Sequence, residues 1–92
     1  MTDNKILLEI VTPERQVVKE MVDEVTAPGI EGYFGVLPGH TPFLTTLKIG
    51  EIFYKADDTT RYLAVFWGYA EVGPDKVIIL AETAETAEEI DV

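Results

Sequence analysis

The residues of this chain that could take part in chemistry gather in one short stretch, 28–42. It holds His40, the only histidine, with four of the seven glycines and three of the five prolines. A histidine beside a hydroxyl group and a carboxylate can act as a general base, and Thr41 and Glu31 are the local candidates. These residues form no recognised catalytic motif, so we interpret His40 as a contact or turn residue.

Closely spaced glycines can also cradle a phosphate group. Here the spacing is Gly29-x2-Gly32-x2-Gly35-x3-Gly39. It fits neither the dinucleotide-binding fingerprint nor the Walker A loop, and no Gly-Lys-Ser/Thr follows. Glycine and proline at this density favour tight turns between short strands. We therefore expect 28–42 to form rigid turns that present side chains to a partner.

Metal binding finds no support in the sequence. The acidic pairs Asp23-Glu24, Asp57-Asp58 and Glu88-Glu89 lack the ligand spacing of a calcium loop. With no cysteine and a single histidine, a thiolate zinc site is excluded and a multi-histidine site is not expected. We expect no catalytic residue, no cofactor and no metal.

Size and charge narrow the class of partner. The 92 residues make one domain, and a formal net charge of −10 repels phosphate backbones and anionic lipid. The longest apolar runs, 63–67 and 77–81, fall short of the roughly twenty residues that span a bilayer. The N-terminus has no signal-peptide pattern. We expect a cytoplasmic protein that binds no nucleic acid and reaches a membrane only through another protein.

The rest of the chain supplies the elements that hold the 28–42 stretch. Short apolar or alternating runs separated by turn signals predict strands, and no gap is long enough for a crossover helix. The fold class is therefore all-β, an antiparallel β-sandwich of about ten short strands in two sheets. The expected strands are Lys5–Thr12, Gln16–Lys19, Met21–Ala27, Gly32–Val36, Phe43–Leu47, Glu51–Lys55, Arg61–Gly68, Tyr69–Val72 and Val77–Ala81. The last is nearly all apolar, which indicates a central strand.

Residues 62–70 are unusually aromatic. Strict alternation puts one face at Tyr62, Ala64, Phe66 and Gly68, and the other at Leu63, Val65, Trp67 and Tyr69. One face fills the core. The other is either covered by the second sheet or exposed as a protein interface, and the sequence leaves both readings open.

The character of the chain changes after Glu82, where alanine and glutamate dominate. Thr86 could cap a helix, with Glu89 at the capping-box position, but about one turn of helix cannot stand alone in water. We expect a β-sandwich domain over residues 1–85 and a short, possible helical stub over 86–92.

The segment Glu31–Thr45 resembles the E-G-x-x-G-x-x-P-G-H-x-P-x-x-T signature of the epsilon subunit of bacterial F-type ATP synthases. The flanks agree, because Val11–Arg15 resembles that family's first strand and turn. Trp67–Val72 resembles its G-x-x-E-V segment, and Ala81–Ala84 its A-[DE]-T-A close. The resemblance is collinear over about residues 5–90.

This resemblance implies a ten-stranded sandwich followed by a C-terminal hairpin of two helices. The chain ends where the first helix would start, so we expect a truncated or short form without the hairpin's inhibitory or ATP-binding roles. The resemblance implies a non-catalytic central-stalk domain that joins the gamma subunit to the ring of c subunits. That places the chain at the cytoplasmic face of the bacterial membrane, as a peripheral part of the complex.

The resemblance also implies which residues contact partners. It places Glu31, Gly32 and Tyr33 near the c ring, and His40 and Thr45 toward gamma or the ring. A second hypothesis comes from another class, a small β-barrel enzyme or ligand binder that uses His40 and the aromatic strand. A deep pocket beneath Trp67 and His40, without an exposed apolar sheet, would favour that second hypothesis.

Overall fold

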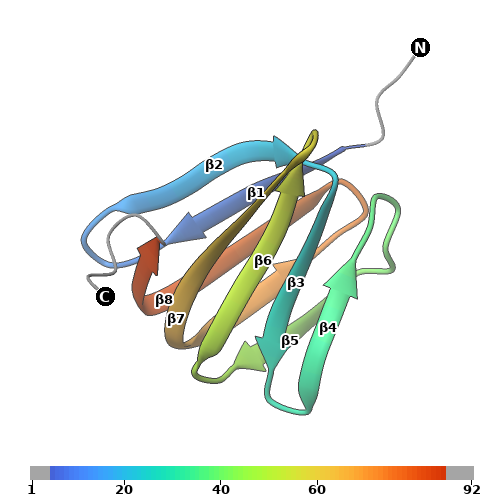
Figure 1. Cartoon of the computed structure of the whole chain (residues 1–92). Helices are drawn as coiled ribbons and strands as arrows, with labels where there is room; N and C mark the ends of the chain where they lie inside the picture. Colours follow the sequence, from blue (N-terminus) through green and yellow to red (C-terminus); the bar gives the residue numbers. More distant parts are fainter. Residues whose placement is uncertain (1–4, 87–92) are drawn as a thin grey trace.

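The computed structural model describes residues 5–86 and confirms the all-β fold class (Figure 1). Its strands are β1 (Ile6–Val11), β2 (Gln16–Val22), β3 (Glu24–Gly29), β4 (Gly32–Val36), β5 (Phe43–Leu47), β6 (Gly50–Ala56), β7 (Thr59–Val72) and β8 (Lys76–Thr86). Turns rich in glycine, proline and aspartate separate them, as the sequence predicts.

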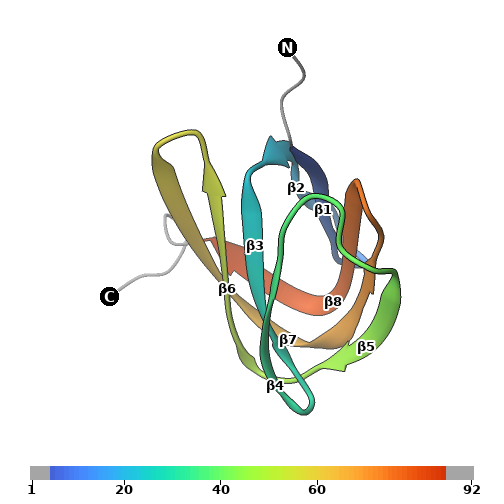
Figure 2. The ribbon, with the colours of Figure 1, turned by 90° about the vertical axis from the view of Figure 1, so that its right-hand side faces the viewer.

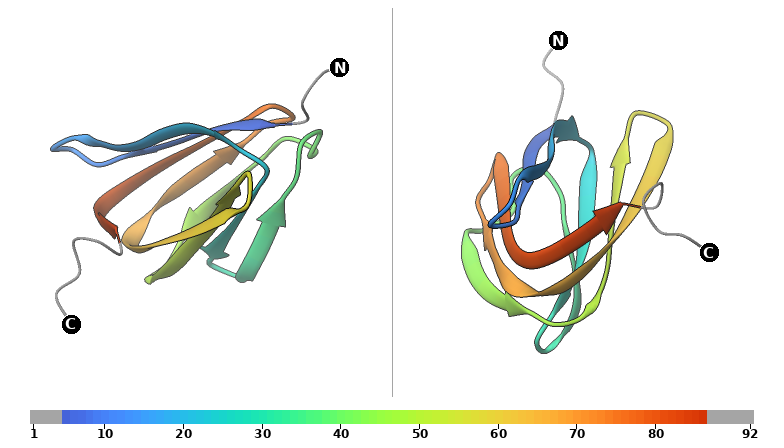
Figure 3. Two further views of the ribbon diagram at one scale, coloured as in Figure 1. Left: turned by 45° about the horizontal axis from the view of Figure 1, so that its top comes forward. Right: turned by 90° about the vertical axis from the view of Figure 1, so that its left-hand side faces the viewer.

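The strands form a sheet in the order β2-β1-β8-β7-β5-β3-β4, with β6 pairing β3 and β7. The first part of β7 (59–65) pairs with β6 and its last part (68–72) with β5. Both β7 and β8 bend sharply, which Figure 3 shows for β8 in its right-hand view. The sheet therefore folds over itself into a sandwich of two layers.

We name the layers after the strands they contain. The β1 layer comprises β2, β1, β5 and the adjoining parts of β8 and β7 (76–81 and 68–72). The β3 layer comprises β4, β3, β6 and the other parts of β7 and β8 (59–66 and 83–86). One core lies between them, and alternate residues of each strand point into it.

The alternation is clearest in β1, where Ile6, Leu8 and Ile10 are fully buried and their neighbours are half-buried. From the facing layer, Ile52 and Leu63 fill the same core. Each such side chain contributes about 1.5–3 kcal/mol by leaving water. This continuous apolar core is what holds a small domain together without disulfides or metals.

The bend of β7 lies at Trp67 and Gly68. Trp67 has a φ of 57°, the left-handed region that costs a non-glycine residue about 1–2 kcal/mol. At Gly68 a Cβ atom would overlap the carbonyl oxygen of Leu80, so only glycine lets β8 approach this closely. The left-handed residue shifts the alternation by one position, and Trp67 points outward, 49% exposed.

This shift corrects one prediction. Leu63 and Val65 are buried, whereas Trp67 and Tyr69 are exposed. The expectation that these four residues share a face is wrong, because alternation holds only while every residue stays extended.

Three details of the fold differ from expectation. The described part of the chain has eight strands, because the expected strands 61–68 and 69–72 are one bent strand, β7. The pairing is not wholly antiparallel, since β1 and β8 run parallel from Leu7–Lys76 to Val11–Leu80. A parallel pair needs a long connection, and here the six intervening strands provide it.

The third difference is at the end of β8, which was expected to stop at Ala81 and continues to Thr86. It does so because residues 83–86 pair with 63–66 of β7. The helical stub predicted from residue 86 onward otherwise lies outside the described residues.

An ion-pair cluster ties the start of β1 to two distant turns. The Lys5 Nζ lies 2.9 Å from Oδ1 of Asp23 and 2.9 Å from Oδ1 of Asp57, and the Asp57 backbone N–H donates to Asp23 Oδ2 at 2.8 Å. The hydrogen bond from Lys5 holds the pKa of Asp23 below its usual range. The two carboxylates in turn raise the pKa of Lys5.

Candidate docking surfaces

The predicted contact residues Glu31, Gly32 and Tyr33 lie together at the turn from β3 to β4. Gly32 has a φ of 132°, which favours glycine and explains its place in the motif. Tyr33 is 54% exposed, and its hydroxyl oxygen accepts a hydrogen bond of 3.2 Å from the Glu51 N–H. These residues form an exposed tip, which the Tyr33 hydroxyl ties to the start of β6.

His40 lies beyond the other end of β4, in the loop that leads to β5. Its backbone N–H donates to the Leu37 carbonyl at 3.1 Å, and its Nδ1 lies 2.6 Å from the Thr41 carbonyl, so Nδ1 carries the proton. The ring packs on Phe43 with the centroids 5.2 Å apart. The neighbouring Gly39 N–H donates to the carbonyl of Pro74, which fastens this loop to the β7–β8 turn.

The structure therefore does not bring the predicted residues into one site. Glu31 and Tyr33 lie at one end of the sandwich and His40 at the other (Figure 1). Thr45 is half-buried on β5, where its hydroxyl lies 3.3 Å from the Thr46 carbonyl oxygen. A partner that touched all of them would have to run along the length of β4.

The outer face of the β1 layer is apolar and exposed. Leu44 on β5, Tyr69 on β7 and Leu80 on β8 are 69%, 57% and 50% exposed. Register joins them with Ile78 and Val11, since Tyr69 pairs with Leu80 and Leu80 with Val11. A shallow hollow of ≈ 390 Å³, nearly all of it apolar, lies between Tyr69, Leu80 and Pro13. An exposed, largely apolar face of this kind is typical of a protein interface.

The charges around this face are few. Glu71 lies in register between Leu44 and Ile78, and Glu9 is held by Lys76 at 3.4 Å. Glu71 thus offers one exposed carboxylate within the apolar face, which suits a partner that brings a basic side chain.

Sequence reasoning left open whether the face with Tyr69 is core or interface, and it singled out neither Leu80 nor Ile78. β8 is central, between β1 and β7, as predicted. A central strand has a neighbour on each side, but here the sheet is covered on one face only, so Ile78 and Leu80 point outward. Alternation along β5 was a signal that could have placed Leu44 on an outer face. It puts Leu44 on the face opposite to Thr45 and the buried Leu47, together with Thr46.

The outer face of the β3 layer carries a row of aromatic rings. Tyr33, Phe53 and Tyr62 come from β4, β6 and β7, with centroids 6.3 Å apart for the first pair and 5.2 Å for the second. Because the rings pack on one another, they leave less of their surface for a partner to cover than the side chains on the apolar face of the β1 layer do.

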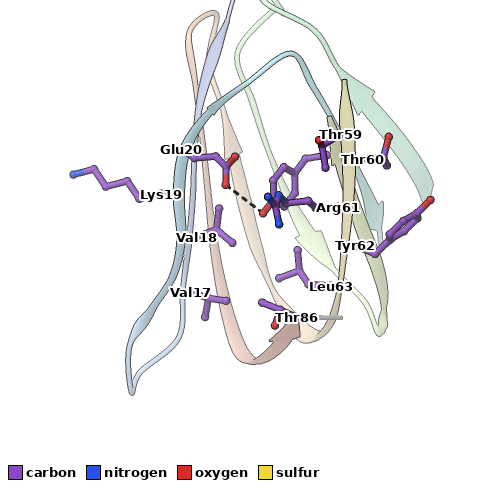
Figure 4. Close-up of a pocket in the computed structure, with 11 residues that line it drawn as sticks. Val17, Val18, Lys19, Glu20, Thr59, Thr60, Arg61, Tyr62, Leu63 and Thr86 are labelled. Atoms are coloured by element: carbon purple, nitrogen blue, oxygen red, sulfur yellow. Dashed lines mark hydrogen bonds between the residues drawn. The ribbon is translucent and has the colours of Figure 1, made fainter. Parts of the chain in front are cut away.

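A polar hollow of ≈ 500 Å³ opens at the opposite edge, between β2 and the β6–β7 hairpin (Figure 4). Val18, Glu20 and Leu63 line it, and the Tyr54 hydroxyl lies 3.5 Å from Glu20 Oε1 across its floor. Neither His40 nor Trp67 belongs to this hollow. A small ligand binder would need a pocket beneath those two residues and no exposed apolar sheet. Neither residue lines this hollow, and the apolar sheet face is exposed.

Comparison with known proteins decides the family. Residues 5–87 match the sequence profile described as the beta-sandwich domain of the ATP synthase delta/epsilon chain. The chain belongs to the ATP synthase delta/epsilon family. Its relatives include the ATP synthase epsilon chain of Syntrophobacter fumaroxidans, 62% identical over 88 residues, and that of Geotalea daltonii, 60% identical over 87 residues. The chain spans about two thirds of these relatives, 66% of the first and 63% of the second.

Solved structures agree with this assignment to the delta/epsilon family. A chain in the mitochondrial ATP synthase of Euglena gracilis, an assembly of OSCP, F1 and c-ring, superposes with a TM-score of 0.88 at 26% identity, over 97% of this chain and 57% of that one. A chain in the central stalk and c-ring of the Tetrahymena thermophila enzyme superposes with a TM-score of 0.76 over 97% of this chain and 72% of that one. At 14% identity the second match supports the fold alone.

Proposed function

We propose that this chain is the sandwich domain of a rotor subunit, which joins the gamma subunit to the c ring and has no catalytic activity of its own. Membership of the delta/epsilon family supports the proposal. The observation that carries it is the exposed apolar face of the β1 layer around Leu44, Tyr69 and Leu80. Such a face is poorly suited to a domain that works alone.

The two ends of β4 suit two partners. We assign the tip with Glu31, Gly32 and Tyr33 to the c ring, where its carboxylate can meet basic loop residues. We assign the apolar face, with His40 and Thr45 nearby, to gamma. The two contacts lie on separate parts of one rigid body, as a coupling element requires.

The mechanism is mechanical. Torque passes through non-covalent contacts, so the domain must transmit it without bending. Backbone hydrogen bonds brace the contact loops, among them Ile30 N–H to the Thr46 carbonyl at 2.9 Å and Lys48 N–H to the Pro28 carbonyl at 3.0 Å. The prolines in these turns limit backbone freedom further.

The domain would act at the cytoplasmic face of a bacterial membrane. It would be bound peripherally through the ATP synthase complex and would not insert into the bilayer. Within residues 5–86 there is no helix long and apolar enough to span a membrane.

Reconstitution tests the proposal. Purified gamma should co-elute with this chain, and an ATP synthase preparation stripped of epsilon should regain coupled ATP synthesis when the chain is added. A chain that fails to bind gamma, or an enzyme that assembles and couples equally well without it, would overturn the proposed function.

A further inference from the structure

Gly35, in the middle of β4, has no explanation within its own chain. The other motif glycines have an explanation. Phe34 crowds Gly29, while Gly32 and Gly39 adopt positive φ values. At Gly35 the φ is not in the left-handed region, and an added Cβ would meet only Thr26 Oγ1, at 4.0 Å. Glycine weakens a strand, and inside a strand it often marks the close approach of another backbone. Nothing in residues 5–86 makes that approach.

The direction of the backbone groups follows from two hydrogen bonds. Lys48 N–H donates to the Pro28 carbonyl and Ile30 N–H donates to the Thr46 carbonyl, so residues 28 and 30 face β5. Backbone groups alternate along a strand, and therefore Ala27 and Gly29 face β4.

The register of β3 with β4 extends this alternation. Ala27 pairs with Phe34, and Pro28 with Tyr33. Phe34 therefore faces β3, while the N–H and C=O groups of Tyr33 and Gly35 face away from it. β4 is the last strand in the sheet order, so among the described residues no strand meets these groups.

This edge lacks the usual protection against strand pairing. Edge strands are commonly blunted by a charged residue, a proline or a bulge. β4 reads Gly-Tyr-Phe-Gly-Val and has none of these. The opposite edge strand, β2, carries Lys19 in its middle. Lys19 pairs with Glu9, and the backbone groups of Glu9 face β8 on the other side of β1. The backbone N–H and C=O of Lys19 therefore also point to a free edge. One edge is blunted and the other is left open.

The open edge lies beside side chains that could receive a docked strand. Phe34 meets Phe43 of β5 edge to face at 5.2 Å, and His40 packs on the same Phe43 ring. Figure 2, which looks onto this side of the molecule, shows the loop that leads from β4 to β5. Leu44, the next residue of β5, points to the outer face of the β1 layer. His40, which follows β4 and packs on Phe43, lies between that face and the end of β4, so a partner that contacts His40 also meets the β4 edge.

We propose that the free edge of β4 pairs with an extended segment of the gamma subunit, which adds a strand to the β3 layer. This inference rests on the proposed function. The segment would bond to the backbone of Tyr33 and Gly35 and pass closest at Gly35. It would be uncharged along β4, where this chain offers no charge, and it would leave the side chains of Glu31 and Tyr33 at the tip to the c ring. Backbone bonds of this kind resist shear, which suits a joint that transmits torque.

Amide hydrogen exchange tests the pairing directly, with the free chain compared with the chain bound to purified gamma. In the free chain the amides of Tyr33 and Gly35 should exchange at least tenfold faster than that of Phe34, which faces β3. Bound gamma should slow both by at least tenfold. Unchanged exchange at both positions in a chain that does bind gamma would overturn the inference and leave the proposed function standing.

A pair of proline substitutions gives an independent readout. Gly35→Pro removes an N–H that faces the free edge, so the chain should still fold and its affinity for gamma should fall at least tenfold. Lys19→Pro makes the same change on the opposite edge and should leave the affinity within twofold. Should Gly35→Pro not fold, Gly35→Val replaces it, because a Cβ has room there. The valine should raise the thermal midpoint and lower the affinity.

The outcomes separate the two hypotheses. If the unmodified chain does not bind gamma, the proposed function fails and the inference fails with it. If it binds, but both Gly35 variants bind equally well, only the strand pairing is wrong.

Discussion

Replacing Tyr69 by threonine should weaken gamma binding while leaving the fold intact. Tyr69 is 57% exposed on the outer face of the β1 layer. An aromatic side chain can bury about 200 Å², so roughly 110 Å² of Tyr69 remains for a partner to cover. At about 25 cal/mol per Å² this area is worth about 3 kcal/mol, or about a hundredfold in affinity. Part of it is offset by ordering and by the contacts that threonine keeps, so we expect a loss of about 30- to 100-fold.

The substitution should have little effect on the stability of the fold, because the removed ring atoms face water in the free chain. Threonine also suits a strand, so the free energy of unfolding should change by about 0.5 kcal/mol or less. Affinity is measured by isothermal titration of gamma into the chain, and stability by thermal unfolding followed by circular dichroism.

Tyr62→Thr is the matched control. Tyr62 lies on the same strand and is 47% exposed, but it points from the outer face of the β3 layer. Its loss should change the affinity for gamma by about twofold at most. Equal losses in the two variants, or no loss for Tyr69→Thr in a folded protein, would refute the assignment of gamma to the β1-layer face.

Three further predictions follow from the geometry. His40→Ala should lower gamma affinity about tenfold but cost only about 1 kcal/mol of stability, since the side chain loses the ring contact with Phe43 and an exposed hydrogen bond to the Thr41 carbonyl; a midpoint many degrees lower with unchanged gamma binding would make His40 structural instead. Gly68→Ala should cost about 2 kcal/mol or more, because its Cβ overlaps the carbonyl oxygen of the facing strand, and should lower the thermal midpoint by roughly 8 °C or more; a midpoint within 2 °C of the parent would contradict this. For pH dependence, the depressed pKa of Asp23 stabilises the fold above about pH 4, a contribution lost as the pH falls through its folded pKa, whereas the raised pKa of Lys5 stabilises the fold below about pH 10 and that contribution fades at higher pH. Chemical denaturation across pH should show both losses shrink in Lys5→Met, and unchanged profiles would exclude the ion-pair cluster as their cause.

Sequence patterns predicted most of the strands because their signals are local. Alternation in Ile6–Val11 and the turn at Asp57-Asp58 each depend on a few neighbouring residues, and the structure confirms both. The same reasoning failed at Trp67, since no local signal shows that a tryptophan will adopt a left-handed conformation. That conformation exists because β7 must bend to serve both layers.

For the predicted contact residues, too, the sequence predicted the local backbone geometry but not the arrangement in space. The E-G-x-x-G and P-G-H motifs were visible as turn chemistry, and Gly32 and Gly39 do take positive φ values. Their separation to opposite ends of β4 was not visible, because distance in space depends on how the strand between them runs.

The amino-acid sequence by itself determined the family, the all-β class and the positions of the tight turns, because motifs, alternation and backbone preferences act over a few residues. Only the tertiary structure decided which faces are covered. It left Leu44, Tyr69 and Leu80 in water, and within residues 5–86 it placed no strand beside the outward-facing backbone groups of Tyr33 and Gly35. Exposure depends on what packs against a strand from elsewhere in the chain, and that arrangement exists only once the sheet has folded over itself.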